Sequence, residues 1–369
     1  MAATLPLPPG FRDRLPPEAE ALARILRTVL DVAAAHGYSR VQPPLAEAEA
    51  GLSAWLGGRS GDLLRLADPR TGAALALRPD MTAQIARIAS TRLAGAARPL
   101  RLSYGGTVLR GRGSELAPAR ELVQAGAELI GADGPDALAE VLGLALEALA
   151  EVGVGDVSVD LTLPGLVAEL AAGAWPVADP EAVAAALDAK DAGALPALGA
   201  GAFAILLEAA GPAEEALARL RAAGPALAPA VDRLAPLVAA LPGVRVTIDP
   251  TERHGFDYQT LGFSLFGAAG AGGRALRDEI GRGGAYAISR PGHAAEPACG
   301  FSLYLDPLVD AGLGRAPRRR ILLPPGTPAE TGRRLRAEGW ETVRALSPAD
   351  RPEGITHILD GETPQPLGP

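Results

Sequence analysis

Residues 121–131, ELVQAGAELIG, predict a β-strand that carries its polar side chains on one face. Successive side chains of a strand point to opposite faces, so Gln124 and Glu128, four positions apart, share a face. Only Gly126 lies between them on that face, and a strand glycine leaves room for a ligand to approach the backbone. With a nearby arginine, an amide and a carboxylate suit a small zwitterion. A solvated strand face with a bulge at the glycine is the structural alternative.

Further extended segments lie on both sides of this strand in the sequence. Residues 98–110 predict a neighbouring strand, joined to it by a polar loop. Apolar runs separated by the turn sequence PRTG predict a hairpin over residues 63–80. Because strict alternation of strands and helices is missing, we expect an α+β fold in which an antiparallel sheet is flanked by helices. The other strand candidates are residues 38–47, 244–250, 258–266 and 299–306.

Helices and a glycine-rich segment complete the expected core. Apolar residues from Leu22 to Ala33 recur three and four positions apart, which is the spacing of an amphipathic helix, and Gly37 follows its end. Residues 81–94 predict a second helix. Residues 268–289 contain enough glycine to be turns and close backbone contacts.

Two changes in composition predict the domain organisation. Residues 165–243 consist mostly of Ala, Leu and Pro with helical spacing, and predict a helical insert within a core of residues 1–315. Residues 316–369 have the order strand, helix, strand, strand. This order predicts a small C-terminal α/β appendage.

The composition excludes several classes of protein. Hydrophobic residues make up 48% and the net charge is −8, so we expect a soluble globular chain without general attraction to phosphate backbones, although a local patch could still bind RNA. A single cysteine, Cys299, excludes a disulfide framework and favours a cytoplasmic location. The histidines lack metal-ligand spacing and no phosphate-binding motif occurs, so neither a metal nor a cofactor is expected. Secretion and membrane insertion are not expected either.

Residues 77–87, LRPDMTAQIAR, place Arg78, Asp80 and Thr82 round a proline. A lone Arg-Pro-Asp sequence is typical of a turn with a local salt bridge. The same charged side chains, placed at a strand end, could instead bind the charged groups of an amino acid. The motif alone leaves both interpretations open.

Taken together and in order, these segments resemble the catalytic core of histidyl-tRNA synthetases, which are class II synthetases, over roughly residues 5–310. The resemblance implies an antiparallel sheet of six or seven strands and a homodimer. It also implies that the appendage is a shortened anticodon-binding domain. The matching segments are LPPGFRDRLPP (7–17), GYSRVQPPLAE (37–47), LRPDMT (77–82), SYGGTVLR (103–110) with QAGAELIG (124–131), GFDYQT (255–260), GRGGAYAI (281–288) and GFSLYLD (300–306).

Departures from the synthetase motifs fall on the ATP side of the site. Class II synthetases stabilise charge on the phosphate oxygens of ATP with arginines, and Arg110 matches the arginine of the second motif. Pro307 stands where the third motif has its arginine, and proline holds no phosphate. Tyr304 replaces the inner glycine of that motif and would crowd a nucleotide.

Other synthetase positions are also changed. The arginine that precedes the Asp-Tyr pair is replaced by His254, with Arg253 one residue out of register, and Arg112 replaces an acid. Ala117-Pro118 replaces a Gly-Arg pair, and Gln259 replaces one tyrosine on the imidazole side. The residues that match amino-acid contacts are retained, which favours binding without activation. They are Asp80, Thr82, Gln124, Glu128 and Tyr286.

This pattern resembles the regulatory subunits of ATP phosphoribosyltransferase, which are paralogues of the synthetase. The resemblance implies a non-catalytic subunit that joins the short-form catalytic subunit in a hetero-oligomer, acts in the first step of L-histidine biosynthesis, binds no tRNA and mediates feedback inhibition by histidine. No catalytic residue is expected. The implied histidine contacts are Asp80 and Gln124 to the α-ammonium group with Thr82 assisting, Arg110 to the carboxylate, and Glu128 with Tyr258 or Tyr286 near the imidazole.

Two other functions compete with this hypothesis. One is an active histidyl-tRNA synthetase, which would exchange pyrophosphate into ATP in the presence of histidine. The other is a stand-alone histidine sensor, or a synthetase-like modifier of another protein. Co-purification with the catalytic phosphoribosyltransferase would separate the three.

Overall fold

The computed structural model describes residues 6–56, 63–113, 118–253, 258–268, 276, 279–289, 294–350 and 352–367. The chain divides into two compact units, Met1–Gly314 and Arg315–Pro369. Each unit is described by itself.

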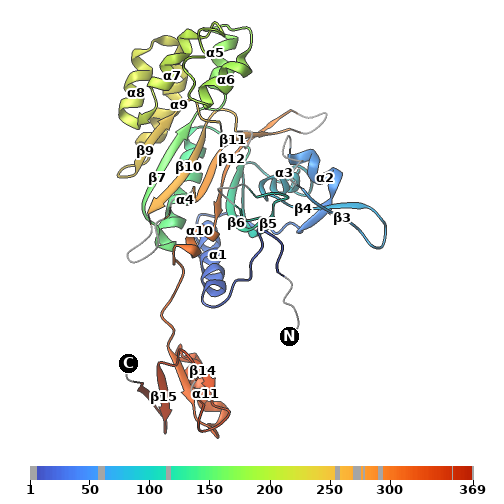
Figure 1. The fold of residues 1–369 in the computed structure, drawn as a ribbon, viewed down its shortest axis with the longest axis vertical. Helices are drawn as coiled ribbons and strands as arrows, with labels where there is room; N and C mark the ends of the chain where they lie inside the picture. The colour runs from blue at the N-terminus through green and yellow to red at the C-terminus, as the bar shows by residue number, and fades with distance from the viewer. Residues whose placement is uncertain are drawn as a thin grey trace. The chain divides into compact units, whose positions relative to one another are not determined.

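A mixed sheet forms the centre of the first unit (Figure 1). Its nine described strands have the order β1-β5-β6-β12-β11-β10-β7-β9-β8, and the six consecutive strands from β5 to β7 are antiparallel throughout. The predicted antiparallel sheet is therefore confirmed. The strands are β1 Ser39–Arg40, β5 Leu100–Leu109, β6 Glu121–Ile130, β7 Gly155–Thr162, β8 Gly211–Pro212, β9 Arg245–Asp249, β10 Gly262–Ala268, β11 Gly281–Ile288 and β12 Glu296–Tyr304.

Strand β11 corrects the expectation of turns over residues 268–289. It lies between β10 and β12, and its glycines allow close packing within the sheet: a Cβ atom on Gly283 would lie 2.2 Å from Phe263 Cζ and 2.3 Å from the carbonyl oxygen of Gly300. The prediction of close backbone contacts was sound, but the conclusion that the segment turns was wrong for residues 281–288. Residues 269–275 and 277–278 lie outside the described residues.

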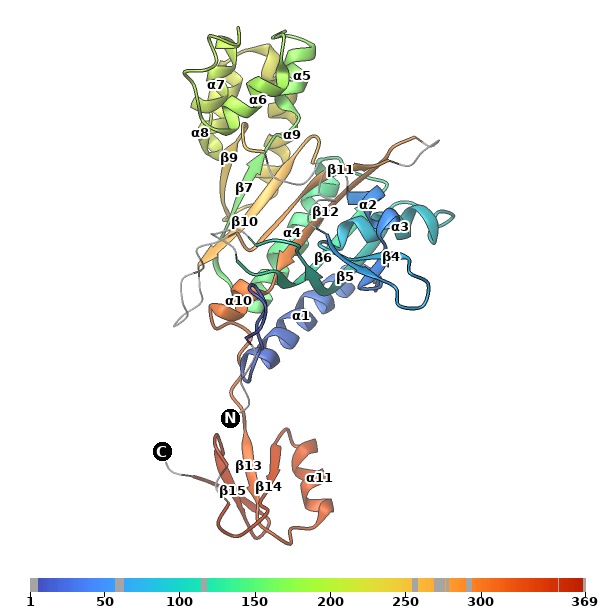
Figure 2. The ribbon, with the colours of Figure 1, turned by 45° about the vertical axis from the view of Figure 1, so that its right-hand side comes forward.

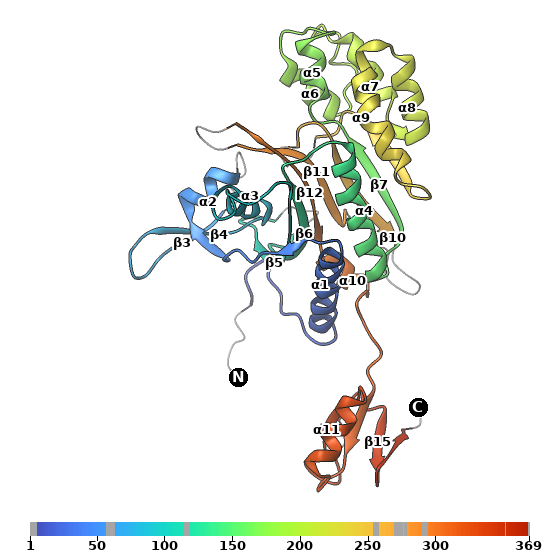
Figure 3. The same ribbon diagram turned by 180° about the vertical axis from the view of Figure 1, so that it is seen from behind.

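Two long helices cover one face of the sheet (Figure 3). Helices α1 (Glu18–Ala35) and α4 (Pro135–Val152) pack against each other and against β5, β6 and β12. Ile25 and Val29 of α1 are each only 1% exposed, which confirms the predicted amphipathic helix. Gly37 follows α1 with φ of +81°, a conformation that glycine adopts without a Cβ penalty.

A smaller layer covers part of the opposite face of the sheet. It consists of α2 (Glu49–Leu56), α3 (Thr82–Thr91) and a three-stranded sheet of order β2-β4-β3. Ile85 and Ala89 of α3 pack with Leu102 and Tyr104 of β5, so α3 fits the predicted helix over 81–94. The predicted hairpin is formed by β3 (Leu64–Ala67) and β4 (Ala74–Leu77), and β2 spans Ala46–Ala48.

A group of short helices connects β7 to β9 at one end of the sheet (Figure 2). Because β7 and β9 are parallel, their connection must cross from one end of the pair to the other, and the helices provide this crossover. Trp175 and Phe203 pack edge to face inside the group, with ring centroids 5.2 Å apart. Its helices are α5 Leu166–Ala172, α6 Pro180–Asp188, α7 Ala204–Glu208, α8 Ala213–Ala222 and α9 Ala228–Ala239, with 3-10 turns at Gly201–Phe203 and Pro225–Leu227.

The second unit is a small α/β layer of order β14-β13-β15-β16 with α11. It follows the predicted order of strand, helix, strand, strand, and β16 adds one strand that the sequence did not indicate. Its resemblance to a shortened anticodon-binding domain remains a prediction. Its elements are β13 Arg320–Leu323, α11 Ala329–Ala337, β14 Glu341–Arg344, β15 His357–Asp360 and β16 Thr363–Pro366.

None of the helices in the described ranges is both long enough and apolar enough to cross a membrane.

Candidate ligand-binding site

The registers of β6, β12 and β11 bring the polar residues of three strands to one face of the sheet. Ser302 on β12 pairs with Gly126 on β6 and with Arg282 on β11. On β12, Tyr304 lies two residues after Ser302 and pairs with Gln124. Gly300 lies two residues before Ser302 and pairs with Glu128. Side chains at alternate positions share a face, so these residues form a continuous surface.

Asp80, Thr82 and Gln124 meet at the start of α3. The Gln124 amide donates to Asp80 Oδ2 at 2.9 Å and to Ser302 Oγ at 2.7 Å, and its oxygen accepts the Met81 N–H at 2.9 Å. Asp80 Oδ1 accepts the Thr82 N–H at 2.8 Å. All of these side chains are buried. The structure therefore brings together three of the residues that the sequence predicted as amino-acid contacts.

Arg78 does not form the local salt bridge that one interpretation of the Arg-Pro-Asp sequence required. Its guanidinium donates to the carbonyl oxygens of Thr107 at 2.8 Å and Pro43 at 2.9 Å. These bonds fix the segment after β4 against β5 and against the loop after β1. Arg78 is therefore a buried residue that supports the backbone beside the site.

Glu128 lies between two tyrosines deeper in the same surface. Tyr104 Oη donates to Glu128 Oε1 at 3.0 Å, and Tyr286 Oη donates to Oε2 at 2.9 Å. Burial raises the pKa of Glu128 to about 8, although both hydroxyl donors and Thr82 act to lower it. The carboxyl group is thus able to exchange a proton near neutral pH.

Tyr104 corrects the expectation that a ligand approaches the backbone at Gly126. The two residues are paired across β5 and β6, and a Cβ atom on Gly126 would lie 2.1 Å from the Phe301 carbonyl oxygen and 2.6 Å from Tyr104 Oη. Tyr104 Oη also lies 2.9 Å from Ser302 Oγ and 3.2 Å from Thr82 Oγ1. The space above the glycine is filled by the tyrosine ring, so the missing side chain makes room for this hydrogen-bond centre.

Tyr258 and Tyr286 close the deep end of the site. Together with Thr82, Glu128 and Ser302 they line a space too small to admit a water molecule. Burial is the main cause that raises the pKa of both tyrosines, so both stay neutral donors. A ligand must therefore separate these side chains to enter. We call the group Asp80, Thr82, Tyr104, Gln124, Glu128, Tyr258, Tyr286 and Ser302 the polar cluster.

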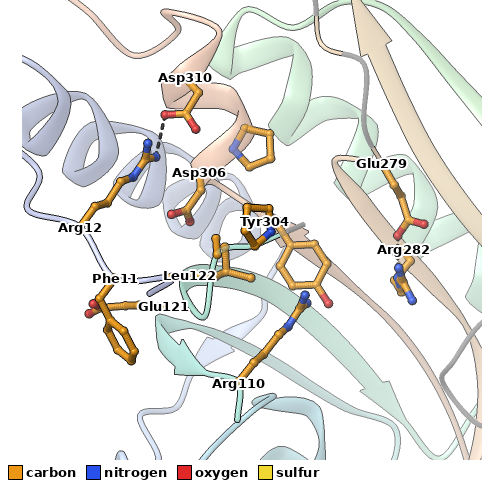
Figure 4. A pocket seen from close by; sticks show the side chains of 14 residues that line it. Phe11, Arg12, Arg110, Glu121, Leu122, Glu279, Arg282, Tyr304, Asp306 and Asp310 are labelled. Carbon is orange, nitrogen blue, oxygen red and sulfur yellow. Dashed lines mark hydrogen bonds and ion pairs between the residues drawn. The ribbon is translucent and has the colours of Figure 1, made fainter. Parts of the chain in front are cut away.

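Arg110 lies apart from the polar cluster and lines a neighbouring open cavity of about 580 Å³ (Figure 4). Its guanidinium carbon is 5.3 Å from the ring centroid of Tyr304, in a cation–π contact. Arg282 and Glu279 line the same cavity, and Arg282 Nε donates to Glu279 Oε1 at 2.5 Å. Six of the seven predicted site residues thus belong to the closed cluster, whereas Arg110 belongs to the open cavity.

The N-terminal segment and helix α10 (Asp306–Asp310) form another wall of the open cavity. Asp306 is paired with Arg14, and its Oδ2 accepts the Val123 N–H at 2.7 Å beside Gln124. Arg12 is paired with Asp310 at 2.7 Å, as the dashed line in Figure 4 shows. The acid of the third motif is therefore engaged in holding β6 and the N-terminal segment.

A family model described as histidyl-tRNA synthetase matches residues 10–308. An ATP phosphoribosyltransferase regulatory subunit of Paramagnetospirillum magneticum is 45% identical, covering 94% of this chain and 92% of that protein. The protein of the same name from Rhodospirillum centenum is 44% identical, over 96% of this chain and 94% of its own. The chain belongs to the ATP phosphoribosyltransferase regulatory subunit family.

Solved structures agree with membership of the regulatory subunit family. A structure from Bacillus halodurans, described as an ATP phosphoribosyltransferase regulatory subunit/histidyl-tRNA synthetase, is 26% identical with a TM-score of 0.78, and 93% of each chain is covered. A histidyl-tRNA synthetase from Nostoc, at 17% identity and a TM-score of 0.73 over 96% of this chain and 90% of that one, supports the fold alone. The predicted class II synthetase-like fold is confirmed.

The altered synthetase positions of this regulatory-subunit chain lie round the open cavity or point elsewhere. Pro307 is at the start of α10 and lines the cavity without a donor group, and Pro118 lines it as well. Arg253 is directed to the helical insert, where it pairs with Glu181 at 2.7 Å. Arg112 is exposed. Ala117, His254 and Asp257 lie outside the described residues.

Sequence reasoning missed three residues of this surface. Tyr104 and Ser302 give the polar cluster its central hydroxyl groups, and Arg282 stands at its border with the open cavity. Tyr104 could have been found from the sequence by pairing the predicted strand 98–110 with the strand 121–131, which places it opposite Gly126. Ser302 and Arg282 could be found only once the order of β11 and β12 in the sheet was known. Within the described ranges, no group of three His, Cys, Asp or Glu residues is arranged to hold a metal ion.

Proposed function

We propose that this chain is the non-catalytic regulatory subunit of ATP phosphoribosyltransferase, and that L-histidine binds the polar cluster to inhibit the first step of histidine biosynthesis by feedback. The observation that carries the proposal is a single surface with two chemically different ends. Asp80 and Gln124 form one end, and Glu128 with its two tyrosines forms the other. Their chemistry matches the ammonium group and the imidazole of histidine.

Each end of the cluster offers the groups that its part of histidine needs. Asp80 and the Gln124 oxygen would accept hydrogen bonds from the α-ammonium group, and Thr82 lies beside them. Glu128, with a pKa near 8, would share a proton with the imidazole, while Tyr258 and Tyr286 enclose the ring. An arginine on the side of the open cavity would complete the site by holding the carboxylate.

The open cavity supports binding without activation. Attack of a carboxylate on ATP needs fixed cations at the phosphate oxygens. Pro307 offers none, the Tyr304 ring occupies the cavity face over Arg110, and Arg253 is engaged by the helical insert. We therefore expect no synthetase activity and no dependence on tRNA.

The proposed partner is the short-form catalytic subunit, in a hetero-oligomer built round a homodimer of this chain. Inhibition then requires that histidine binds one arrangement of the assembly more tightly than the other, and the coupling equals that difference in binding free energy. The closed polar cluster fits such a mechanism, because a ligand must rearrange it to enter.

The decisive experiment uses the purified full chain with the catalytic subunit. We expect the two to co-purify, the phosphoribosyltransferase activity to rise on addition of this chain, and histidine to inhibit only the complex. Histidine-dependent exchange of pyrophosphate into ATP would establish an active synthetase instead. Histidine binding without any association at micromolar concentration would favour a stand-alone sensor.

A further inference from the structure

We propose that Arg282 binds the α-carboxylate of the amino acid and so sets the selectivity of the site for a complete amino acid over a bare imidazole amine. The inference rests on the proposed function and assigns the third anchoring group of the same site. Arg282 belongs to the segment 268–289 that sequence reasoning interpreted as turns.

The sheet register places Arg282 next to the ammonium end of the site. Arg282 pairs with Ser302 on the neighbouring strand, and Ser302 Oγ accepts the Gln124 amide at 2.7 Å. Neighbouring strands lie only about 4.8 Å apart. Because the ammonium and carboxylate groups of an amino acid share one carbon atom, the carboxylate of a ligand held by Asp80 and Gln124 lies within reach of the Arg282 guanidinium.

Arg110 starts further from the same point. Measured from Ser302, Arg110 is two strands away, since Ser302 pairs with Gly126 and Gly126 pairs with Tyr104 of β5. It also lies six residues beyond Tyr104 along β5, or about 20 Å at roughly 3.3 Å per residue. Its guanidinium lies over the ring of Tyr304, and both side chains line the open cavity. Figure 4 shows Arg110 beside this ring and Arg282 on a different side of the cavity.

The contacts of Arg282 leave a free edge for a carboxylate. Its Nε donates to Glu279, whereas neither terminal nitrogen donates to another residue in the described part of the chain. The side chain is 30% exposed and lines the open cavity, so a ligand in the cavity can reach it. A guanidinium held at Nε presents two parallel N–H groups, the geometry that binds a carboxylate.

The charge of Arg282 acts on groups in both compartments. The Arg282 cation acts to lower the pKa of Tyr258, which lines the closed space, and of Tyr304, which lines the open cavity. A carboxylate on Arg282 would therefore face the open cavity, while the imidazole points toward Glu128. This arrangement gives the ligand one orientation.

The test compares L-histidine with histamine, which lacks the carboxylate, by calorimetric titration of the full chain. For the wild type we expect tighter binding of histidine. Arg282→Gln is expected to weaken histidine binding by about 10- to 100-fold, the range for a charge-assisted hydrogen bond, and to leave histamine binding within about twofold. Arg282→Lys keeps the positive charge but loses the two parallel N–H groups, so we expect a smaller loss of histidine affinity.

Matched variants separate the possible outcomes. Arg245→Gln on β9 makes the same substitution at an exposed site far along the sheet and should bind both ligands as the wild type does. Two outcomes would overturn the assignment of Arg282 alone. In the first, Arg110→Gln loses the preference for histidine over histamine and Arg282→Gln keeps it. In the second, Arg282→Gln and Arg282→Lys each weaken the binding of histidine and histamine equally. Failure of the wild type to bind histidine at millimolar concentration would overturn the proposed function together with it.

Discussion

The polar cluster and the open cavity lie side by side on one sheet, but their polar groups are satisfied in different ways. In the cluster, buried side chains bond to one another, as Gln124 does to Asp80 and Tyr104 to Glu128. In the open cavity, Arg12, Arg110 and Arg282 line a volume of about 580 Å³. The comparison teaches that polar groups which bond to one another close a surface on itself, whereas the side chains round the open cavity leave a volume between them.

Among the substitutions, one in the wall of the open cavity gives the largest expected loss of stability. Arg14→Ala is expected to lower the free energy of unfolding by about 3 kcal/mol, because it leaves the buried Asp306 carboxylate without its cation. Arg12→Ala removes the exposed pair with Asp310 from the same segment and should cost less than about 1 kcal/mol. Urea unfolding of both variants measures the difference, and equal losses would show that burial does not decide it.

A pair of buried glutamines tests whether the polar cluster binds histidine. Gln124→Ala should weaken histidine binding by about 100-fold and lower stability by about 2 kcal/mol, since Met81 and Ser302 lose a partner. Gln84 is equally buried but donates to Pro44 and Glu47, outside the cluster. Gln84→Ala should therefore cost similar stability and leave histidine binding unchanged. Calorimetric titration and thermal unfolding distinguish the two, and unchanged binding in Gln124→Ala would return the cluster to a purely structural role.

Glu128→Gln tests the charge state of the closed cluster. The folded pKa of Glu128 is about 8, above the ordinary value of about 4.5, so the native state holds its proton more firmly than the unfolded state does. The resulting contribution to the free energy of unfolding is fully present below about pH 4.5. It is lost as the pH rises toward 8, by up to about 1.4 kcal/mol per pH unit. Urea unfolding between pH 5 and pH 8 should show this decline in the wild type. The same decline in Glu128→Gln would assign it to other groups.

The smallest effect is expected for Arg253, which pairs with the helical insert. Arg253→Ala removes an exposed pair with Glu181 and should change the free energy of unfolding by less than about 1 kcal/mol. Histidine binding should stay within about threefold of the wild type, because the side chain contacts the helical insert. A loss of binding comparable to that of Gln124→Ala would show that Arg253 acts on the site.

Local periodicity explains which parts could be predicted. Helix α1 has a hydrophobic pattern with a period of 3.6 residues, and in strand β6 the polar residues Gln124 and Glu128 are four positions apart. Both elements, and the shared face of these two residues, were located from the sequence. Strand β11 was missed because its glycines imitate turn chemistry, and only the Phe263 ring and the Gly300 carbonyl group beside Gly283 reveal why glycine is required. A glycine-rich composition therefore indicates that side chains are excluded, but not which neighbouring atoms fill the space.

The sequence alone determined the family resemblance, the antiparallel sheet and six of the residues that meet in the polar cluster, because these depend on the order and spacing of residues along the chain. Only the tertiary structure decided that Tyr104 fills the space over Gly126, that Arg78 supports the backbone, and that Arg282 stands beside Ser302. These facts depend on which strands become neighbours and in which register. Strand order is set by contacts between residues far apart in the chain, and no local pattern encodes it.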